Sequence, residues 1–456
     1  MCRDDESRGK RRMKTPIVDF VKGYREAGPS RFHMHGHKGR SFLGCEALDI
    51  TEISGADVLY HADGIIAESE ENATALFGTA HTFYSAEGST LAIKAMLALA
   101  TERKRGERPL VLAGRNAHKT FIYGAALLDL DVEWLYPAEG DHLCACEITP
   151  EMLRAALGSM AKKPNAVYIT SPDYLGRVAD IAGLSAVCRE WHVPLLVDNA
   201  HGAYIGFLTP SQHPIALGAA MCCDSAHKTL PVLTGGAYLH IAESAPLSYL
   251  AGARQALSLF ASTSPSYLIL QSLDLCNAYL ADGYKEKLRL GIECVTAVKT
   301  ALAKLGFAPE ESEPMKIVLR AAKYGYTGEE MASVLRRYCV EPEFADDEYL
   351  VLMVSLENDM QDFERVLAAF SEMRPRRPLW LLHYPLCKGK AVMRPREAML
   401  SAQTSIPVEK AVGRICAAPT VSCPPAVPIA VSGEVITEEV ARLFLRYGIQ
   451  TVSVIR

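Results

Sequence analysis

The chain has 456 residues, of which 49% are hydrophobic and 22% are charged, and its net charge is -5. This length exceeds what one hydrophobic core supports, so two or three domains are expected. The small negative charge gives no general attraction to nucleic acid or to anionic membranes, and no apolar run reaches the roughly 18 residues that span a bilayer. We therefore expect neither nucleic acid nor a membrane as a partner.

The N-terminus, MCRDDESRGKRRMK, mixes both charges and leads into no apolar segment, so no secretory signal is expected. Residues 1–13 form an extension whose place in the native protein is open, because Met13 is a second candidate for the first residue. The 13 cysteines are odd in number and scattered. This pattern favours reduced thiols and a cytoplasmic location over a disulfide framework.

The first segment with several reactive side chains is FHMHGHKGR, residues 32–40. His33, His35 and His37 alternate as they would along one face of a strand, which raises the possibility of a metal site. No cluster of carboxylates or cysteines follows closely in the sequence to complete the ligand set. We therefore expect no metal.

Short β-rich runs alternate with longer amphipathic segments from about residue 85 to residue 241. Strands are predicted at residues 108–114, 131–137, 165–170, 193–200, 219–225 and 236–242, and helices at residues 149–163 and 181–192. Such alternation predicts an α/β domain with a mostly parallel sheet, built from right-handed βαβ units. Ligands of these sheets bind beyond the carboxyl ends of the strands.

The pattern changes beyond about residue 265, where residues 283–306 predict a long helix followed by a shorter α/β portion. A basic, proline-containing stretch near residue 374 reads as a boundary. We expect an N-terminal segment (1–45), a large domain (46–265), a small α/β domain (266–372) and a C-terminal domain (373–456).

Two reactive side chains follow neighbouring strands of the large domain. Asp198 comes directly after the apolar run PLLV, and Lys228 follows the strand that ends at Ser225. A buried carboxylate needs a cationic partner or several hydrogen bonds. A carboxylate and a lysine at neighbouring strand ends suit pyridoxal 5'-phosphate, because the lysine can form a Schiff base with its aldehyde and the carboxylate can keep its pyridine nitrogen protonated.

Two further features fit the same cofactor. Gly88, Ser89 and Thr90 lead into a helical pattern, and the free amides at a helix N-terminus suit a phosphate. His118 follows another predicted strand and offers an imidazole that could stack on the cofactor ring. Each feature is common when taken alone, so the prediction rests on their occurrence together in one domain.

With these motifs in place, the sequence resembles the Orn/Lys/Arg decarboxylases, which are pyridoxal phosphate enzymes with an aspartate aminotransferase-like (fold type I) large domain. The resemblance covers nearly the whole chain and looks like the short form of the family, without the N-terminal regulatory domain. One departure is Asn199, which stands where the family usually has glutamate. The matching segments are residues 32–40, 48–59, 88–90, 115–120, 170–176, 198–204, 224–231, 262–267 and 424–434.

The resemblance implies roles for individual residues. It makes Lys228 the Schiff-base lysine, Asp198 the partner of the pyridine nitrogen and His118 the ring-stacking residue, and it places His227 among the catalytic residues. The implied cofactor-binding set is Gly88, Ser89, Thr90, His118, Asp198, Ala200, His201, Ser225, His227 and Lys228.

The resemblance also implies decarboxylation of arginine, lysine or ornithine, which would feed polyamine metabolism. Either His227 or Lys228 would return a proton to Cα. A cationic substrate tail needs a carboxylate, for which Glu434 and Asp57 are the candidates. A homodimer or larger homo-oligomer with shared active sites is implied as well.

Two other interpretations stay open at this point. The same fold supports transamination or β-elimination, and Arg320 is the candidate for clamping the substrate α-carboxylate in such a reaction. A non-catalytic homologue is the other possibility. The presence of both Lys228 and Asp198 speaks against it.

Overall fold

The computed structural model describes residues 13–101, 107–137, 142–381, 388–419 and 425–456. Its centre is a seven-stranded sheet in the order β1-β7-β6-β5-β4-β2-β3, in which only β7 runs antiparallel to its neighbours. The strands are β1 (His81–Ser85), β2 (Leu110–Gly114), β3 (Asp131–Leu135), β4 (Ala166–Thr170), β5 (Leu195–Asp198), β6 (Met221–Asp224) and β7 (Ala237–Ile241).

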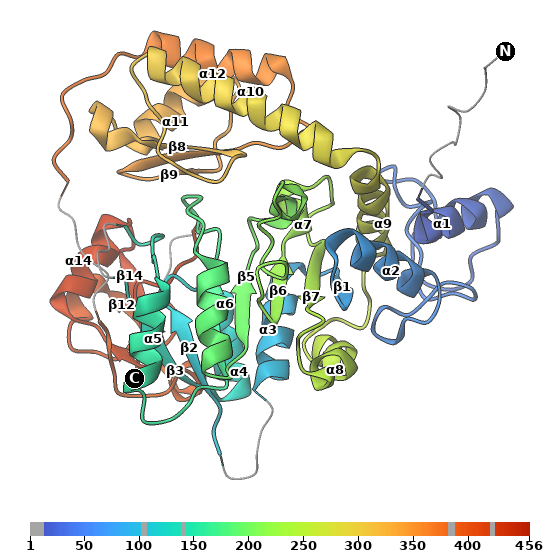
Figure 1. Cartoon of the computed structure of the whole chain (residues 1–456), viewed down its shortest axis with the longest axis horizontal. Coiled ribbons are helices and arrows are strands. Elements are labelled where there is room, and N and C mark those ends of the chain that lie inside the picture. The colour runs from blue at the N-terminus through green and yellow to red at the C-terminus, as the bar shows by residue number, and fades with distance from the viewer. Residues whose placement is uncertain (1–12, 102–106, 138–141, 382–387, 420–424) are drawn as a thin grey trace.

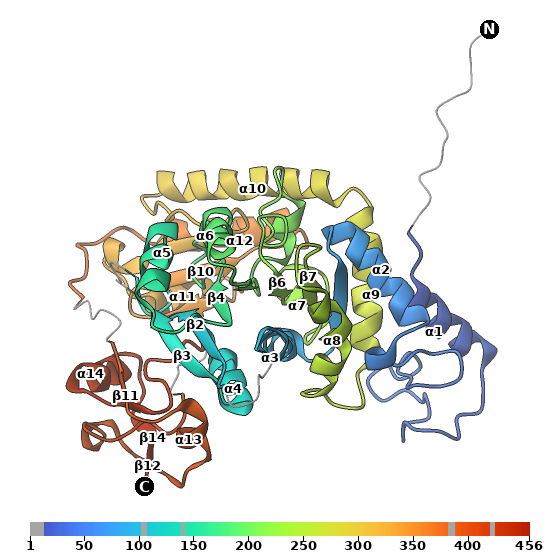
Figure 2. The same cartoon turned by 60° about the horizontal axis from the view of Figure 1, so that its bottom comes forward.

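Helices cover both faces of this sheet (Figures 1 and 2). Successive side chains of a strand point to opposite faces, so Val111 packs in one core and Leu112 in the other. The first core includes α3 (Gly88–Ala100), α4 (Lys119–Leu128) and α8 (Leu247–Ser258), and the second includes α5 (Pro150–Ser159) and α6 (Ile181–Glu190). Strands buried on both faces account for the continuous apolar runs in the sequence.

A group of three helices, two of them near the N-terminus, packs beside the β1 edge of the sheet (Figure 1). It consists of α1 (Pro16–Ala27), α2 (Ile65–Phe77) and α9 (Tyr267–Ala281). The buried carboxylate of Asp274 accepts hydrogen bonds from the backbone N–H groups of Ile17 and Val18, both at 3.0 Å. These two amides have no partner within α1, so Asp274 fixes the start of α1 to α9.

A second, smaller sheet lies above the carboxyl edge of the central sheet (Figure 1). It is antiparallel, with the order β8 (Lys316–Arg320), β10 (Tyr349–Met353) and β9 (Phe344–Ala345). The helices that pack with it are α10 (Tyr284–Lys304), α11 (Gly328–Arg337) and α12 (Met360–Glu372).

The C-terminal part has its own apolar core and lies beside β3 (Figure 2). Its elements are β11 (Lys390–Ala391), α13 (Pro395–Leu400), β12 (Gln403–Pro407), β13 (Glu434–Val435), α14 (Glu438–Arg446) and β14 (Thr451–Ile455). β12 pairs with β14 and β11 pairs with β13. The backbone N–H of Lys119 donates to the carbonyl of Ala426 at 2.9 Å, which joins this part to the start of α4.

The expected α/β class, the six predicted strands and the predicted helices near residues 150, 181 and 284 are confirmed. β1 was not predicted, because its residues HTFYS show little of the apolar run that marked the other strands. The domain boundaries stay a prediction, and residues 1–12 of the predicted N-terminal segment lie outside the described part of the chain. In that described part, no helix has both the length and the apolar character of a membrane span.

Candidate active site

The candidate site lies where β4, β5 and β6 end, below the small sheet (Figure 1). Asp198 is the last residue of β5, and Lys228 lies in the four-residue helix α7 (Ala226–Thr229) that follows β6. Because these strands are parallel neighbours, their carboxyl ends bring the two side chains to one edge of the sheet.

Asp198 has a buried carboxylate that accepts hydrogen bonds on both oxygens. Tyr168 of β4 donates its hydroxyl to Oδ2 at 3.0 Å, and the backbone N–H of Ala200 donates to Oδ1 at 3.2 Å. Asp198 is only 2% exposed, yet it forms no ion pair with any residue that the structure describes. A buried anion in this state favours a cationic group beside it.

The amine of Lys228 lies near enough to Asp198 for the charge of the carboxylate to act on it, in a recess that solvent reaches. Its Nζ lies 3.0 Å from Nε2 of the buried His201 and donates to it. Protein atoms on the other sides of the amine reduce its hydration, which lowers the pKa of Lys228, while the charge of Asp198 acts in the opposite direction. An accessible amine with a lowered pKa is suited to react with an aldehyde.

Two histidines flank the same space. Burial lowers the pKa of His118 to about 4; Asp198 opposes this, and Lys228 and Lys119 add to it. The His118 ring is fixed by its own helix, since Nδ1 accepts the backbone N–H of Thr120 at 3.2 Å, so the neutral ring carries its proton on Nε2. Burial lowers the pKa of His201 well below 6.5, and its Nδ1 has no hydrogen-bond partner among the described residues.

The predicted phosphate-binding residues also converge. α3 begins at Gly88, whose φ of 70° suits glycine, and the amides of its first turn have no partner within the helix. Ser225 donates its hydroxyl to Ser89 at 2.8 Å, which joins the start of α3 to the end of β6. His227 donates from Nδ1 to the carbonyl of Gly236 at 2.9 Å, and Gly88 faces its ring.

These observations agree with the chemistry of pyridoxal 5'-phosphate. The unpaired carboxylate of Asp198 suits a protonated ring nitrogen, and the unpartnered Nδ1 of His201 is a free polar atom beside Lys228. The start of α3 offers amides and hydroxyls of the kind that bind a dianion. The residues present therefore fit the cofactor.

The two predicted substrate carboxylates have other partners. Asp57 accepts hydrogen bonds from the backbone N–H groups of Val58, Asp63, Gly64, Ile66 and Ala67. Burial alone would raise the pKa of Asp57, but these donors lower it overall. Because Gly64, Ile66 and Ala67 lie at the start of α2, this arrangement caps α2 and favours a structural role over a substrate-binding one.

Glu434 is buried in the C-terminal part, beside a buried arginine. Its Oε2 accepts the backbone N–H of Val431 at 2.8 Å and lies 3.7 Å from Nη2 of Arg115. Arg115 also donates to the carbonyls of Pro428 and Ile429, at 2.7 and 2.9 Å. Since Arg115 lies three residues before His118, these contacts hold the Glu434 segment close to the site. A substrate role for Glu434 stays a prediction.

The histidines of the N-terminal segment have a carboxylate neighbour that sequence spacing did not indicate. Asp49 lies 3.3 Å from Nε2 of His37 and 3.9 Å from Nδ1 of His35, so these residues form a group with metal-ligand chemistry. The backbone N–H of Gly39 donates to Nδ1 of His37, which leaves the proton of the neutral ring on Nε2. This tautomer donates to Asp49, so the geometry fits a hydrogen bond and the expected absence of metal stays a prediction.

Arg320 is engaged and does not present a free guanidinium. Its Nη2 lies 2.6 Å from Glu348, which also pairs with Arg446 at 3.3 Å. A guanidinium held in this way is poorly placed to clamp a substrate carboxylate, so the structure removes the observation that favoured transamination.

Some residues of the site were not found from the sequence. Tyr168 holds Asp198, and the ring of Tyr174 packs edge-on against His201 with centroids 5.0 Å apart. A tyrosine inside a buried strand needs a partner for its hydroxyl, and this was the available signal for Tyr168. Tyr174 lies in the matching segment 170–176, but its packing against His201 leaves no periodic pattern that would single it out.

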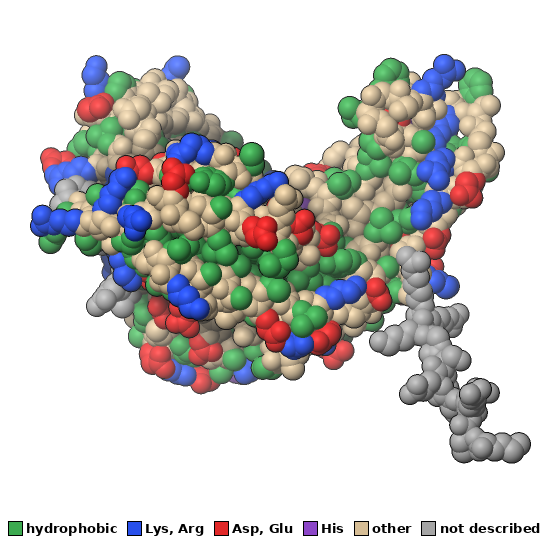
Figure 3. Space-filling view, turned by 90° about the horizontal axis from the view of Figure 1, so that it is seen from above, with side chains coloured by type: hydrophobic (Ala, Val, Ile, Leu, Met, Phe, Trp, Pro, Cys, Tyr) green, Lys and Arg blue, Asp and Glu red, His purple; other side chains and the backbone are tan. Residues whose placement is uncertain are grey.

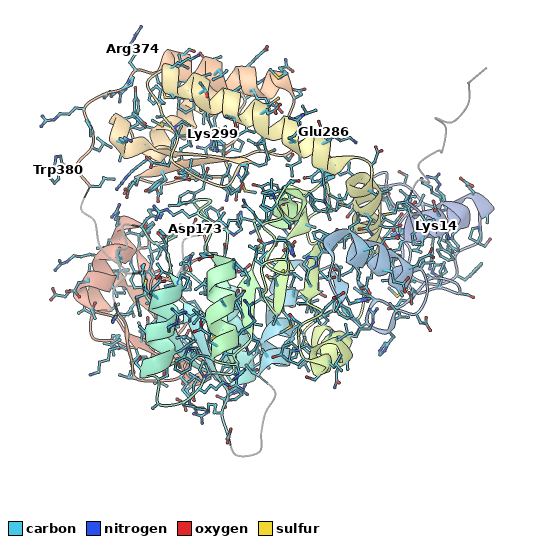
Figure 4. All side chains as sticks on the ribbon, in the orientation of Figure 1. Lys14, Asp173, Glu286, Lys299, Arg374 and Trp380 are labelled. Carbon is cyan, nitrogen blue, oxygen red and sulfur yellow. The ribbon has the colours of Figure 1, made fainter. Side chains whose placement is uncertain are left out.

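A cavity of about 600 Å³ opens at the same edge of the sheet, and Asp173 is one of its lining residues (Figure 4). Burial raises the pKa of Asp173 to about 6. Lys228, His201 and Asp198 are not among the residues that line this cavity.

Comparison with known proteins shows which family the sequence matches. The family model of the Orn/Lys/Arg decarboxylase major domain matches residues 15–308. An arginine decarboxylase of Halalkalibacterium halodurans is 28% identical and covers 94% of this chain and 92% of that protein. An arginine decarboxylase of Bacillus subtilis is also 28% identical, over 93% of this chain and 92% of that protein.

Solved structures share the fold. The constitutive lysine decarboxylase of E. coli superposes with a TM-score of 0.77 at 17% identity, covering 97% of this chain and 82% of that chain. A structure of SPT with PLP superposes with a TM-score of 0.55 at 15% identity, covering 78% of this chain and 83% of that chain. These likenesses confirm the expected aspartate aminotransferase-like fold.

Proposed function

Because the chain is an enzyme of the Orn/Lys/Arg decarboxylase family, we propose that it removes the α-carboxylate of a basic amino acid as CO₂ and releases the corresponding amine, with pyridoxal 5'-phosphate as cofactor. The observation that carries the proposal is the pair formed by Lys228 and Asp198: an accessible amine with a lowered pKa beside a buried carboxylate that has no cationic partner among the described residues.

The residues that would hold the cofactor follow from the geometry. Lys228 would bind it covalently, and the start of α3 with Ser89 and Ser225 would hold its phosphate. Asp198 would keep a proton on the ring nitrogen, and its hydrogen bonds from Tyr168 and from the backbone of Ala200 would hold the carboxylate in place for this role. Bound pyridoxal phosphate supplies a ring that accepts the electron pair left when CO₂ departs.

After CO₂ has left, a proton has to reach the Cα atom of the substrate, and two side chains of the protein could deliver it. Lys228 is one, since its lowered pKa makes the ammonium a better proton donor than an ordinary lysine. His227 is the other, because its Nδ1–H donates to Gly236 and leaves Nε2 free to exchange a proton. Both candidates remain part of the proposal.

Arginine is our first choice of substrate, with lysine next and ornithine third. Support comes from the relatives named arginine decarboxylase, which align over more than nine-tenths of this chain. Glu434 would hold the cationic tail. A homodimer with shared sites, a cytoplasmic location and a role in supplying amines for polyamine metabolism belong to the same proposal.

The test is to incubate the protein and pyridoxal phosphate with arginine, lysine and ornithine separately and to measure CO₂ and amine. Release of agmatine, cadaverine or putrescine is expected from one substrate, and release is expected to disappear in Lys228→Ala but not in the surface control Lys287→Ala. A protein that binds the cofactor but leaves all three amino acids intact would contradict the proposal.

A further inference from the structure

A buried carboxylate lies directly behind the candidate site and takes no part in the chemistry proposed above. Asp224 is the last residue of β6 and is fully buried. Its Oδ1 accepts a hydrogen bond from Nδ2 of Asn199 at 2.7 Å. Its Oδ2 lies 3.1 Å from Nε2 of His213 and 3.2 Å from Nε2 of His240, which are also buried.

The bond between Asn199 and Asp224 joins the two chain segments that carry the site. Asn199 follows Asp198 directly, and Asp224 lies four residues before Lys228. The backbone N–H of Asn199 also donates to the carbonyl of Cys223 at 3.0 Å. The side chain and the backbone of Asn199 therefore both tie the segment that carries Asp198 to the segment that leads to Lys228.

The Asn199 side chain has a defined orientation. Gly202 packs against its Oδ1 so closely that any Cβ at residue 202 would collide with it. Oδ1 accepts no hydrogen bond from the described residues, so Nδ2 is the only polar atom of this amide in use. A carboxylate at position 199 would place an unpartnered, charged oxygen there and would face Asp224 across a buried contact.

Asp224 carries the negative charge of the group that it forms with Asn199, His213 and His240. Burial would raise the pKa of Asp224, but His213 and His240 together lower it overall, so the carboxylate stays ionised. One acid and one amide therefore share the contact, with the acid on β6. The family resemblance places a carboxylate at position 199; here Asp224 supplies the carboxylate from the opposite side of the hydrogen bond.

We propose that Asn199 and Asp224 form an acid–amide pair that positions Asp198 against the cofactor ring. The pair needs one carboxylate and one amide, because two carboxylates would repel each other. Both are positioning residues, since they act through Asp198 and the backbone leading to Lys228. The proposal rests on the proposed function for its cofactor and does not depend on which amino acid is decarboxylated.

The test compares the two single variants Asn199→Asp and Asp224→Asn with the double variant that carries both. Asn199→Asp sets two carboxylates against each other, and Asp224→Asn removes the acceptor charge that His213 and His240 face. The double variant restores one acid and one amide with their places exchanged. Asn358→Asp, the same change at an exposed position, is the matched control.

Three quantities are measured for each protein: the dissociation constant for pyridoxal phosphate, the visible absorbance of the bound cofactor as a function of pH, and the Tm without cofactor. Each single variant is expected to weaken cofactor binding about tenfold or more and to shift the absorbance titration, because Asp198 moves relative to the ring nitrogen. The double variant is expected to regain part of both losses, because one acid and one amide again share the contact although His213 and His240 no longer face a carboxylate, and the control is expected to change neither.

A double variant no better than the worse single variant, or absorbance titrations that match wild type in all variants, would overturn the proposal. A parallel fall of Tm with an unchanged titration would show a merely structural pair and would also overturn it. Metal bound at one equivalent to the purified protein and lost in Asp224→Asn would replace the pair by a metal site at His213, Asp224 and His240.

The outcomes separate this inference from the proposed function. A wild-type protein that binds pyridoxal phosphate but decarboxylates none of the three amino acids contradicts the proposed function alone, because the cofactor spectra still decide on the pair. A wild-type protein that binds no cofactor contradicts both.

Discussion

Asp198 has a carboxylate whose oxygens accept hydrogen bonds from Tyr168 and from the backbone of Ala200, with no cation from the described residues within ion-pair distance. These hydrogen bonds, with a longer one from the thiol of Cys223 at 3.7 Å, hold the group in place but supply no counter-charge. The charge is then available to a bound cofactor. The same charge opposes the lowering of the pKa of both His118 and Lys228.

Replacing Asp198 by asparagine tests this charge with little change in shape. We expect kcat to fall by on the order of 100-fold or more, because the preorganised charge is lost where the reaction needs it. Tm without cofactor should change little, since the amide can still accept from Tyr168. Steady-state kinetics beside Asp282→Asn, an exposed aspartate, checks the result; equal kcat in the two variants would contradict the role of Asp198.

The lowered pKa of His118 predicts how the stability of the protein depends on pH. Its folded-state pKa of about 4 lies below the usual value of 6.5, so the unfolded chain takes up this proton at a higher pH than the folded one. The stability that comes from a neutral His118 is present above pH 6.5 and is lost as the pH falls towards 4. Tm should therefore drop less between pH 6.5 and 4 in His118→Gln than in wild type. Parallel Tm curves would contradict the lowered pKa.

At the scale of elements, the strands predicted from apolar runs agree with the structure, because buried parallel strands lack polar alternation. The edge strand β1 escaped prediction, since its polar residues His81, Thr82 and Ser85 resemble a turn. Lys228, Asp198 and His118 could be chosen from their places after strands. Tyr168 and Asp224 could not, because their roles depend on which strand lies next to which.

Asp57 stabilises a single element, because its carboxylate caps the N-terminus of α2. Five backbone N–H donors around the start of α2 converge on it. Asp57→Asn should lower the free energy of unfolding by about 1 kcal/mol, the usual effect of a lost N-terminal cap, with KM nearly unchanged. Thermal melting and KM for the preferred substrate decide: a KM raised tenfold at unchanged Tm would restore the substrate role predicted from the sequence.

At the scale of the whole molecule, the small sheet is joined to the segment after β5 by a buried polar contact. Glu313, just before β8, accepts the hydroxyl of Tyr204 and pairs with the buried Lys316 at 3.5 Å. Lys316 also donates to the carbonyl of Tyr174, whose ring packs against His201. The position of the small sheet is thus linked to the residue that contacts Lys228.

Glu313→Gln should therefore destabilise the molecule strongly. It leaves the Lys316 ammonium buried without its counter-charge, a change that costs about 3–5 kcal/mol in comparable buried pairs. We expect Tm to fall by several degrees and the double variant with Lys316→Met to recover part of the loss. Glu310→Gln, a change at a neighbouring glutamate, is the control, and an unchanged Tm in Glu313→Gln would contradict the contact.

The surface agrees with a small-molecule enzyme in having basic and acidic side chains mixed on the face drawn in Figure 3. Charge alone therefore does not direct the molecule to a partner of one sign. The proposed function therefore rests on the ends of the strands, where the chain places Asp198 and Lys228.

The most direct measurement is to incubate the protein with pyridoxal phosphate, reduce it with borohydride and locate the added mass by peptide mass spectrometry. The account predicts one pyridoxyl group per chain, on Lys228, with no visible absorbance and no labelling in Lys228→Ala. Labelling of another lysine at full occupancy, or none at all, would contradict the assignment of Lys228 and with it the proposed reaction.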